Sequence, residues 1–115
     1  MLLGELILHC FHASTNAHVL HLTTKSYAVH VALNGFYDEI ITLADSLAEA
    51  GSAFGLLTFP PVPYAPSKDA EELMEELLAK VDEYIEDTDE GHLINIAEEI
   101  KALIASTLYK LRFLK

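Results

Sequence analysis

Apolar residues recur at intervals of three and four along most of this chain, which is the spacing of one face of an α-helix. The pattern predicts four helices, over about residues 2–22, 27–50, 68–86 and 92–113. No stretch of the sequence alternates apolar and polar residues as a half-buried strand does. The sequence therefore predicts an all-α fold, a four-helix bundle in one domain spanning residues 1–115.

Turn-forming residues separate the predicted helices. Ser26 can cap the second helix, which we expect to end at Gly51, and Ser67 can cap the third. All four prolines lie within residues 60–66, so we expect residues 51–66 to form a long irregular crossover. Several of its side chains are too apolar for a solvated linker, and we expect them to pack over one end of the bundle: Phe54, Leu56, Leu57, Phe59 and Tyr64.

The second predicted helix carries two apolar stripes side by side. The first stripe is apolar throughout and suits the core of the bundle: Val29, Leu33, Phe36, Ile40, Leu43 and Leu47. The second stripe mixes apolar and polar side chains: His30, Asn34, Tyr37, Ile41 and Ala44/Asp45. Because one helix face is enough to join a bundle, the second stripe indicates contact with a partner subunit.

Composition and charge narrow the classes of function. Hydrophobic residues make up 51% of the chain, which is ample for one buried core and excludes a disordered protein. The net charge of −11 opposes direct binding to nucleic acid or to an anionic membrane, so neither partner is expected. Cys10 is the single cysteine, and the amino end lacks the basic cluster of a secretory signal, so we expect a cytoplasmic location.

The candidate chemistry lies in histidines and carboxylates of the first two helices. Any one of the six histidines is, by itself, best interpreted as an ordinary core or surface imidazole. His18 and His30 differ because both are six residues from Thr24, so an antiparallel hairpin centred there would set them level. Asp45 and Glu49 are four residues apart and share a helix face, as ligands of a hard cation or as a solvated pair.

A single chain cannot bring these two pairs together. His30 and Asp45 are fifteen residues apart on one helix, hence about 22 Å apart along its axis. If two copies of the second helix cross antiparallel near residues 37 and 38, His30 of one copy meets Asp45 of the other. The sequence thus indicates a site shared across a two-fold axis, and Gly35 is then explained by a close approach between helices, although a helix can simply tolerate a glycine.

Residues 18–50, HVLHLTTKSYAVHVALNGFYDEIITLADSLAEA, resemble the core of the Dps proteins, the miniferritin branch of the ferritin-like superfamily. In that family two histidines twelve residues apart come from one subunit. An Asp fifteen residues further on and a Glu four beyond it come from the two-fold partner. His18, His30, Asp45 and Glu49 match this spacing residue by residue.

The resemblance implies a shortened ferritin-like bundle that dimerises through its second helix. It also implies that His18, His30, Asp45 and Glu49 form an inter-subunit ferroxidase centre, which binds iron and oxidises Fe²⁺ to Fe³⁺ for storage or detoxification. The implied assembly is a homo-oligomer, at least a two-fold dimer, with the family's dodecameric cage as the larger form. Val19 stands where the family usually has Trp, and Asn34 where many members have another acidic ligand.

Two alternatives remain open at this point. The same four side chains could bind Zn²⁺ or Mn²⁺ instead of iron, because imidazole and carboxylate ligands do not select one of these metals. The acidic composition also fits a non-catalytic helical dimer that binds a basic partner protein.

Overall fold

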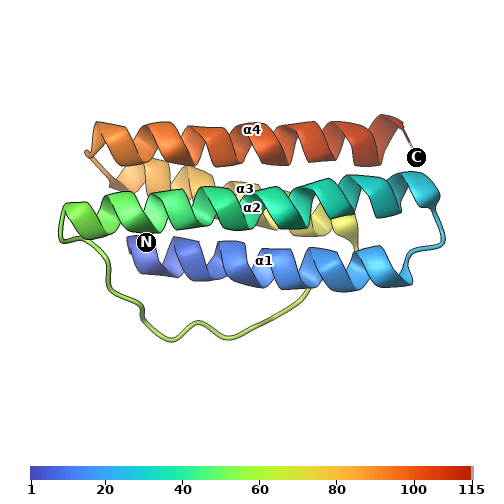
Figure 1. Cartoon of the computed structure of the whole chain (residues 1–115), viewed down its shortest axis with the longest axis horizontal. Helices are drawn as coiled ribbons and strands as arrows, with labels where there is room; N and C mark the ends of the chain where they lie inside the picture. The colour runs from blue at the N-terminus through green and yellow to red at the C-terminus, as the bar shows by residue number, and fades with distance from the viewer. Residues whose placement is uncertain (115) are drawn as a thin grey trace.

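The computed structural model describes residues 1–114, and these residues form four α-helices and no strand (Figure 1). The helices are α1 (Leu3–Thr23), α2 (Tyr27–Ala53), α3 (Ala70–Asp87) and α4 (Gly91–Phe113). The predicted all-α fold with four helices is confirmed. None of the helices within residues 1–114 combines the length and the apolar character needed to cross a bilayer.

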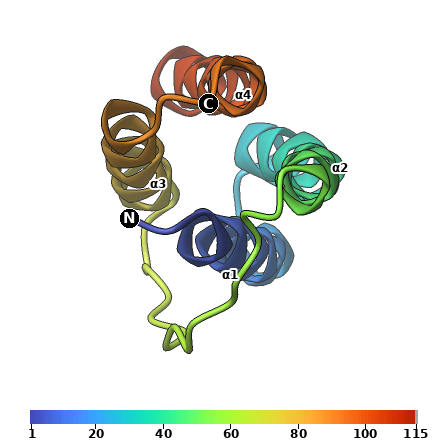
Figure 2. The same ribbon diagram turned by 90° about the vertical axis from the view of Figure 1, so that its left-hand side faces the viewer.

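The helices form a ring in the order α1, α2, α4, α3, so that each packs mainly against two neighbours (Figure 2). The connection between α2 and α3 runs back along the bundle, so α2 and α3 point in the same direction (Figure 1). Helices α1 and α4 point in the opposite direction. Every neighbouring pair is therefore antiparallel. If all three connections were short, each helix would instead run opposite to the one before it in the chain, and α2 and α3 would be antiparallel.

One hydrophobic core lies between the four helices. Four of the six residues in the predicted inner stripe of α2 are almost completely buried: Leu33, Phe36, Ile40 and Leu47. The other two, Val29 and Leu43, are partly buried and pack against the core. Burying a side chain of this size stabilises the folded state by about 1.5–3 kcal/mol. The other helices contribute side chains that are equally inaccessible: Leu6, Ile7, Met74, Val81, Leu93, Ile100, Ile104 and Leu111.

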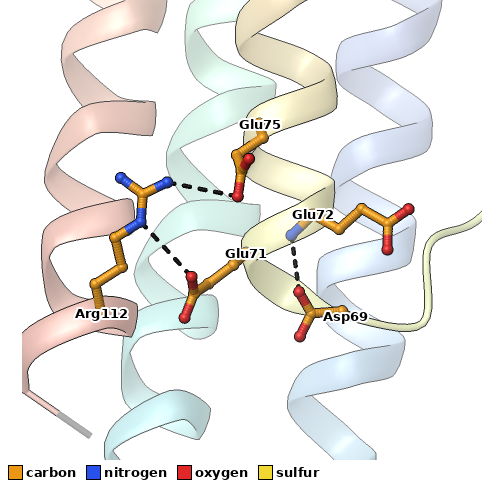
Figure 3. Close-up of polar contacts among 5 residues, drawn as sticks. All are labelled: Asp69, Glu71, Glu72, Glu75 and Arg112. Carbon is orange, nitrogen blue, oxygen red and sulfur yellow. Dashed lines mark hydrogen bonds and ion pairs between the residues drawn. The ribbon is translucent and has the colours of Figure 1, made fainter.

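Two helix boundaries differ from the prediction. Helix α2 continues through Gly51, where a Cβ atom would collide with the side chain of Leu3, so this glycine serves close packing and does not end the helix. Helix α3 is capped by Asp69, whose carboxylate accepts a hydrogen bond of 2.9 Å from the backbone N–H of Glu72 (Figure 3). Ser67 is therefore not the cap.

Ser67 instead fastens the crossover to α1. The amide of Asn16 donates to the backbone oxygen of Ser67 at 2.9 Å and accepts from its backbone N–H at 2.8 Å. Asn16 is 4% exposed, and within residues 1–114 no buried polar side-chain atom lacks a hydrogen-bond partner. The clamp explains why a buried amide is tolerated on α1.

The crossover passes on the outer side of α1 and does not close over an end of the bundle (Figure 2). The sequence-based expectation is wrong for Phe54, Leu56, Phe59 and Tyr64, which remain 45–50% exposed. Only Leu57 packs partly against the core. The crossover has to connect the end of α2 to the start of α3, which lies toward the opposite end of the bundle (Figure 1). It therefore runs along the side of the bundle and does not fold over one end.

Arg112 connects α4 to α3 at the surface. Its Nε lies 3.6 Å from a carboxylate oxygen of Glu71, and its Nη2 lies 3.4 Å from one of Glu75 (Figure 3). Ion pairs this exposed contribute at most about 1 kcal/mol, so the apolar core carries most of the stability of the bundle.

Candidate functional site

The register between α1 and α2 decides which candidate residues meet. Ser14 donates through its hydroxyl to the backbone oxygen of Tyr37 at 2.9 Å, and His21 and His30 contact each other in the same register. His30 is therefore level with His21, and His18 lies about one turn away. The expectation that His18 and His30 are level fails because the helices end at Thr23 and begin at Tyr27, which places the centre of the turn beyond Thr24.

His21 and His30 form a reciprocal pair. Their rings stack with centroids 3.7 Å apart and planes 19° apart. The Nδ1 atom of His21 lies 2.7 Å from the backbone oxygen of His30, and the Nδ1 atom of His30 lies 2.9 Å from the backbone oxygen of His21. Because a carbonyl oxygen only accepts, both Nδ1 atoms carry hydrogen, and the neutral rings keep a free lone pair on Nε2.

His18 and Tyr37 extend this pair along the surface. Their rings stack almost in parallel at 4.2 Å, and the Tyr37 ring also meets that of His21 edge-on at 5.3 Å. The Tyr37 hydroxyl donates to the side-chain oxygen of Asn34 at 2.8 Å. We call His18, His21, His30 and Tyr37 the histidine–tyrosine cluster; His21 is buried, His30 and Tyr37 are partly exposed, and His18 is exposed.

Asp45 and Glu49 lie further along α2, and both are exposed. One chain does not bring them to His18 or His30, in keeping with the separation of about 22 Å along the helix. Within residues 1–114, no group of three or more His, Cys, Asp or Glu side chains is arranged to hold a metal ion. All four residues remain predicted ligands of a site that needs a second copy of the chain.

A second group of titratable side chains surrounds a small cavity between α1, the crossover and α3. The cavity has a volume of about 60 Å³, room for a few water molecules. His9, His12, Tyr64, Glu76 and Lys80 are among its lining residues. Burial lowers the pKa of His9, and the positive charge of Lys80 lowers it further.

The comparisons with known proteins bear on the same helices. A sequence model described as "Family of unknown function (DUF5856)" matches residues 21–111. The chain belongs to this family. The DUF5856 match begins at His21, so it contains His30, Asp45 and Glu49 and leaves His18 outside. Comparison of the chain with curated proteins and with solved structures found no match.

Proposed function

We propose that this protein binds iron at a site shared by two copies of the chain and oxidises Fe²⁺ to Fe³⁺, as the resemblance to Dps proteins implies. His18 and His30 of one copy and Asp45 and Glu49 of the other are the proposed ligands. Fe²⁺ is the substrate in this scheme. The product Fe³⁺ would be stored or detoxified.

The connectivity of the bundle supports a ferritin-like classification. Ferritin-like bundles join four helices with one long crossover, which makes the second and third helices parallel. The chain has this arrangement, with the crossover between α2 and α3 (Figure 1).

The state of the His30 ring is the observation that carries the proposal. Metal-binding histidines usually donate one ring N–H to a carbonyl or carboxylate, which orients the other nitrogen toward the metal. The Nδ1 of His30 is engaged in this way by the backbone oxygen of His21, at 2.9 Å. Its Nε2 is then the nitrogen that can bind Fe²⁺.

The outer stripe of α2 supports a two-fold contact. Tyr37 and Ile41 are large side chains left partly exposed between His30 and Asp45. An antiparallel crossing of two α2 helices near residues 37 and 38 would cover both and bring His30 to Asp45 of the other copy. The two-fold axis would generate two equivalent sites.

The chemistry needs an oxidant and a balanced electron count. The imidazole nitrogens and the carboxylates of Asp45 and Glu49 would bind Fe²⁺, with Glu49 as the proposed bridging ligand. Two Fe²⁺ ions give one electron each to a peroxide, whose O–O bond breaks, and two protons complete two water molecules. Dioxygen is the alternative oxidant, and Zn²⁺ or Mn²⁺ would compete for the same ligands.

Anaerobic titration with Fe²⁺, followed by addition of peroxide, tests the proposal. We expect saturable binding and accelerated oxidation in the wild type, and loss of both in the Asp45→Ala/Glu49→Ala variant. Glu39→Ala is the matched control, because it removes an exposed carboxylate from the same helix outside the proposed ligand set. Absence of saturable binding in the wild type would reject the ferroxidase and favour an acidic dimer with a basic partner. A monomeric mass by light scattering would reject the shared site.

A further inference from the structure

The two proposed imidazole ligands are held in different ways. The Nδ1 atom of His30 lies 2.9 Å from the backbone oxygen of His21, and the two rings stack at 3.7 Å. The exposed side chain of His18 has no hydrogen bond to any part of residues 1–114. Its ring lies instead against the rings of Tyr37 and His21, with centroids 4.2 and 6.0 Å away. The orientation of His18 therefore depends on aromatic contacts.

Tyr37 makes the closer of these contacts with His18. The planes of the two rings are 7° apart, so the rings form a nearly parallel stack. A metal ion binds an imidazole through the lone pair of a ring nitrogen, which lies in the plane of the ring. Stacking on one face thus restrains the direction of the His18 ring and leaves the nitrogens at its edge free for a metal.

Tyr37 is itself fixed at three points. The hydroxyl of Ser14 donates to the backbone oxygen of Tyr37 at 2.9 Å, and the hydroxyl of Tyr37 donates to the side-chain oxygen of Asn34 at 2.8 Å. The edge-on contact between the rings of Tyr37 and His21, at 5.3 Å, is the third. Ser14 and His18 are four residues apart on α1 and share a face, so one residue of α2 can meet both. Tyr37 therefore offers His18 a ring whose own position is determined.

We infer that Tyr37 is a positioning residue for the proposed ligand His18, and that Asn34 supports Tyr37 by accepting the hydrogen bond of its hydroxyl. The inference rests on the proposed function, because it concerns a ligand of that site. Without the stack, the ring of His18 would occupy other rotamers as well. The apparent affinity for Fe²⁺ would then fall in proportion to the fraction of chains that keep the binding orientation. For a stacked aromatic pair this corresponds to a factor of about 2–10.

Removing the ring and the hydroxyl of Tyr37 separately tests the inference. In anaerobic titrations, Tyr37→Leu should bind Fe²⁺ about 2–10-fold more weakly than the wild type, because it removes the ring on which His18 stacks. Tyr37→Phe keeps that ring and should restore most of the affinity. Asn34→Ala removes the same hydrogen bond as Tyr37→Phe, so the two substitutions combined should lose no more affinity than either one alone.

Two control variants separate positioning from other effects of the substitution. Tyr109→Leu removes an exposed tyrosine ring from α4, outside the histidine–tyrosine cluster, and should leave the affinity for Fe²⁺ unchanged. Ile41→Ala changes the same outer stripe of α2 one turn beyond Tyr37, so it reports the effect of altering the proposed two-fold contact alone. At a protein concentration at which light scattering gives a dimeric mass for every variant, Ile41→Ala should keep the affinity of the wild type.

Proton NMR of the metal-free protein gives a second readout. The Tyr37 ring should shift the ring-proton resonances of His18 upfield in the wild type and in Tyr37→Phe, and Tyr37→Leu should return them toward those of a free imidazole. The inference is rejected if the wild type binds Fe²⁺ saturably and Tyr37→Leu binds it equally well. It is also rejected if Tyr37→Phe loses as much affinity as Tyr37→Leu, because the hydroxyl would then be a ligand itself. Absence of saturable binding in the wild type would reject the proposed function and this role of Tyr37 together.

Discussion

The rings of His21 and His30 lie 3.7 Å apart, and each Nδ1 faces the backbone oxygen of the other residue. This pair ties the last turn of α1 to the first turn of α2 through two side chains and two main-chain groups. It also leaves the second nitrogen of each ring available. The same contact therefore stabilises the hairpin and orients a proposed ligand.

Replacement of His21 by Ala should lower the free energy of unfolding by about 2 kcal/mol. The substitution removes the ring stack, worth about 0.5–1.5 kcal/mol, and a hydrogen bond from a buried side chain, worth about 1 kcal/mol. Urea denaturation followed by circular dichroism measures the change. His92→Ala removes an exposed ring as the control and should stay within about 0.5 kcal/mol of the wild type. Equal losses in the two variants would contradict this role of the pair.

Two glycines should respond to alanine in opposite directions. At Gly35 an added Cβ meets open space, so Gly35→Ala should stabilise the helix by up to about 1 kcal/mol. At Gly4 it would collide with the backbone oxygen of Thr58, so Gly4→Ala must displace the crossover and should destabilise by about 1–3 kcal/mol. Thermal unfolding of both variants at the same concentration compares them. A loss at Gly35 that grows with protein concentration would point to close approach by a second chain.

Cys10 should not react in the folded protein. Complete burial raises the pKa of its thiol to about 12, so almost no thiolate is present near neutral pH. Its folded pKa is above its ordinary value of 9.0, so its contribution to stability is complete below that pH and is lost between pH 9 and 12. Iodoacetamide should label Cys10 only in urea. Rapid labelling of the native protein would show that α1 opens locally.

His9 should make the protein less stable as the pH falls. Burial, and then the charge of Lys80, lowers the pKa of His9 below its ordinary value of 6.5. Below that pH the unfolded chain binds a proton that the folded chain does not, so the free energy of unfolding decreases until the folded pKa is passed. Urea titrations from neutral to mildly acidic pH should show a shallower slope for His9→Gln. Lys80→Gln should give an intermediate slope, and an unchanged slope in both variants would exclude this cause.

The core of the bundle could be predicted from the sequence because helical spacing identifies which face of each helix is apolar. Leu33, Phe36 and Ile40 lie on one such face and are buried. The spacing contains no information about the exact centre of a turn. The predicted centre at Thr24 was about one and a half residues too early, so His18 was predicted opposite His30 in place of His21. His21 lies three residues after His18 and therefore shares a face of α1 with it, so the correct register would have identified His21 as the partner.

The crossover and the shared site lie beyond what periodicity can predict. Irregular segments have no repeating face, so the exposure of Phe54 and Phe59 could not be read from their apolar character. The position of Asp45 relative to His30 of a second copy depends on how two chains pack. The sequence of one chain predicts only which residues face outward from its own bundle.

The direction imposed by the crossover has an electrical consequence. Each helix carries a dipole along its axis, and antiparallel neighbours oppose one another, so the dipoles of α1 and α4 largely cancel those of α2 and α3. The electrostatic field around the molecule is therefore set mainly by its charged side chains, which give a net charge of −11. Surface substitutions can change that field while the backbone keeps its arrangement.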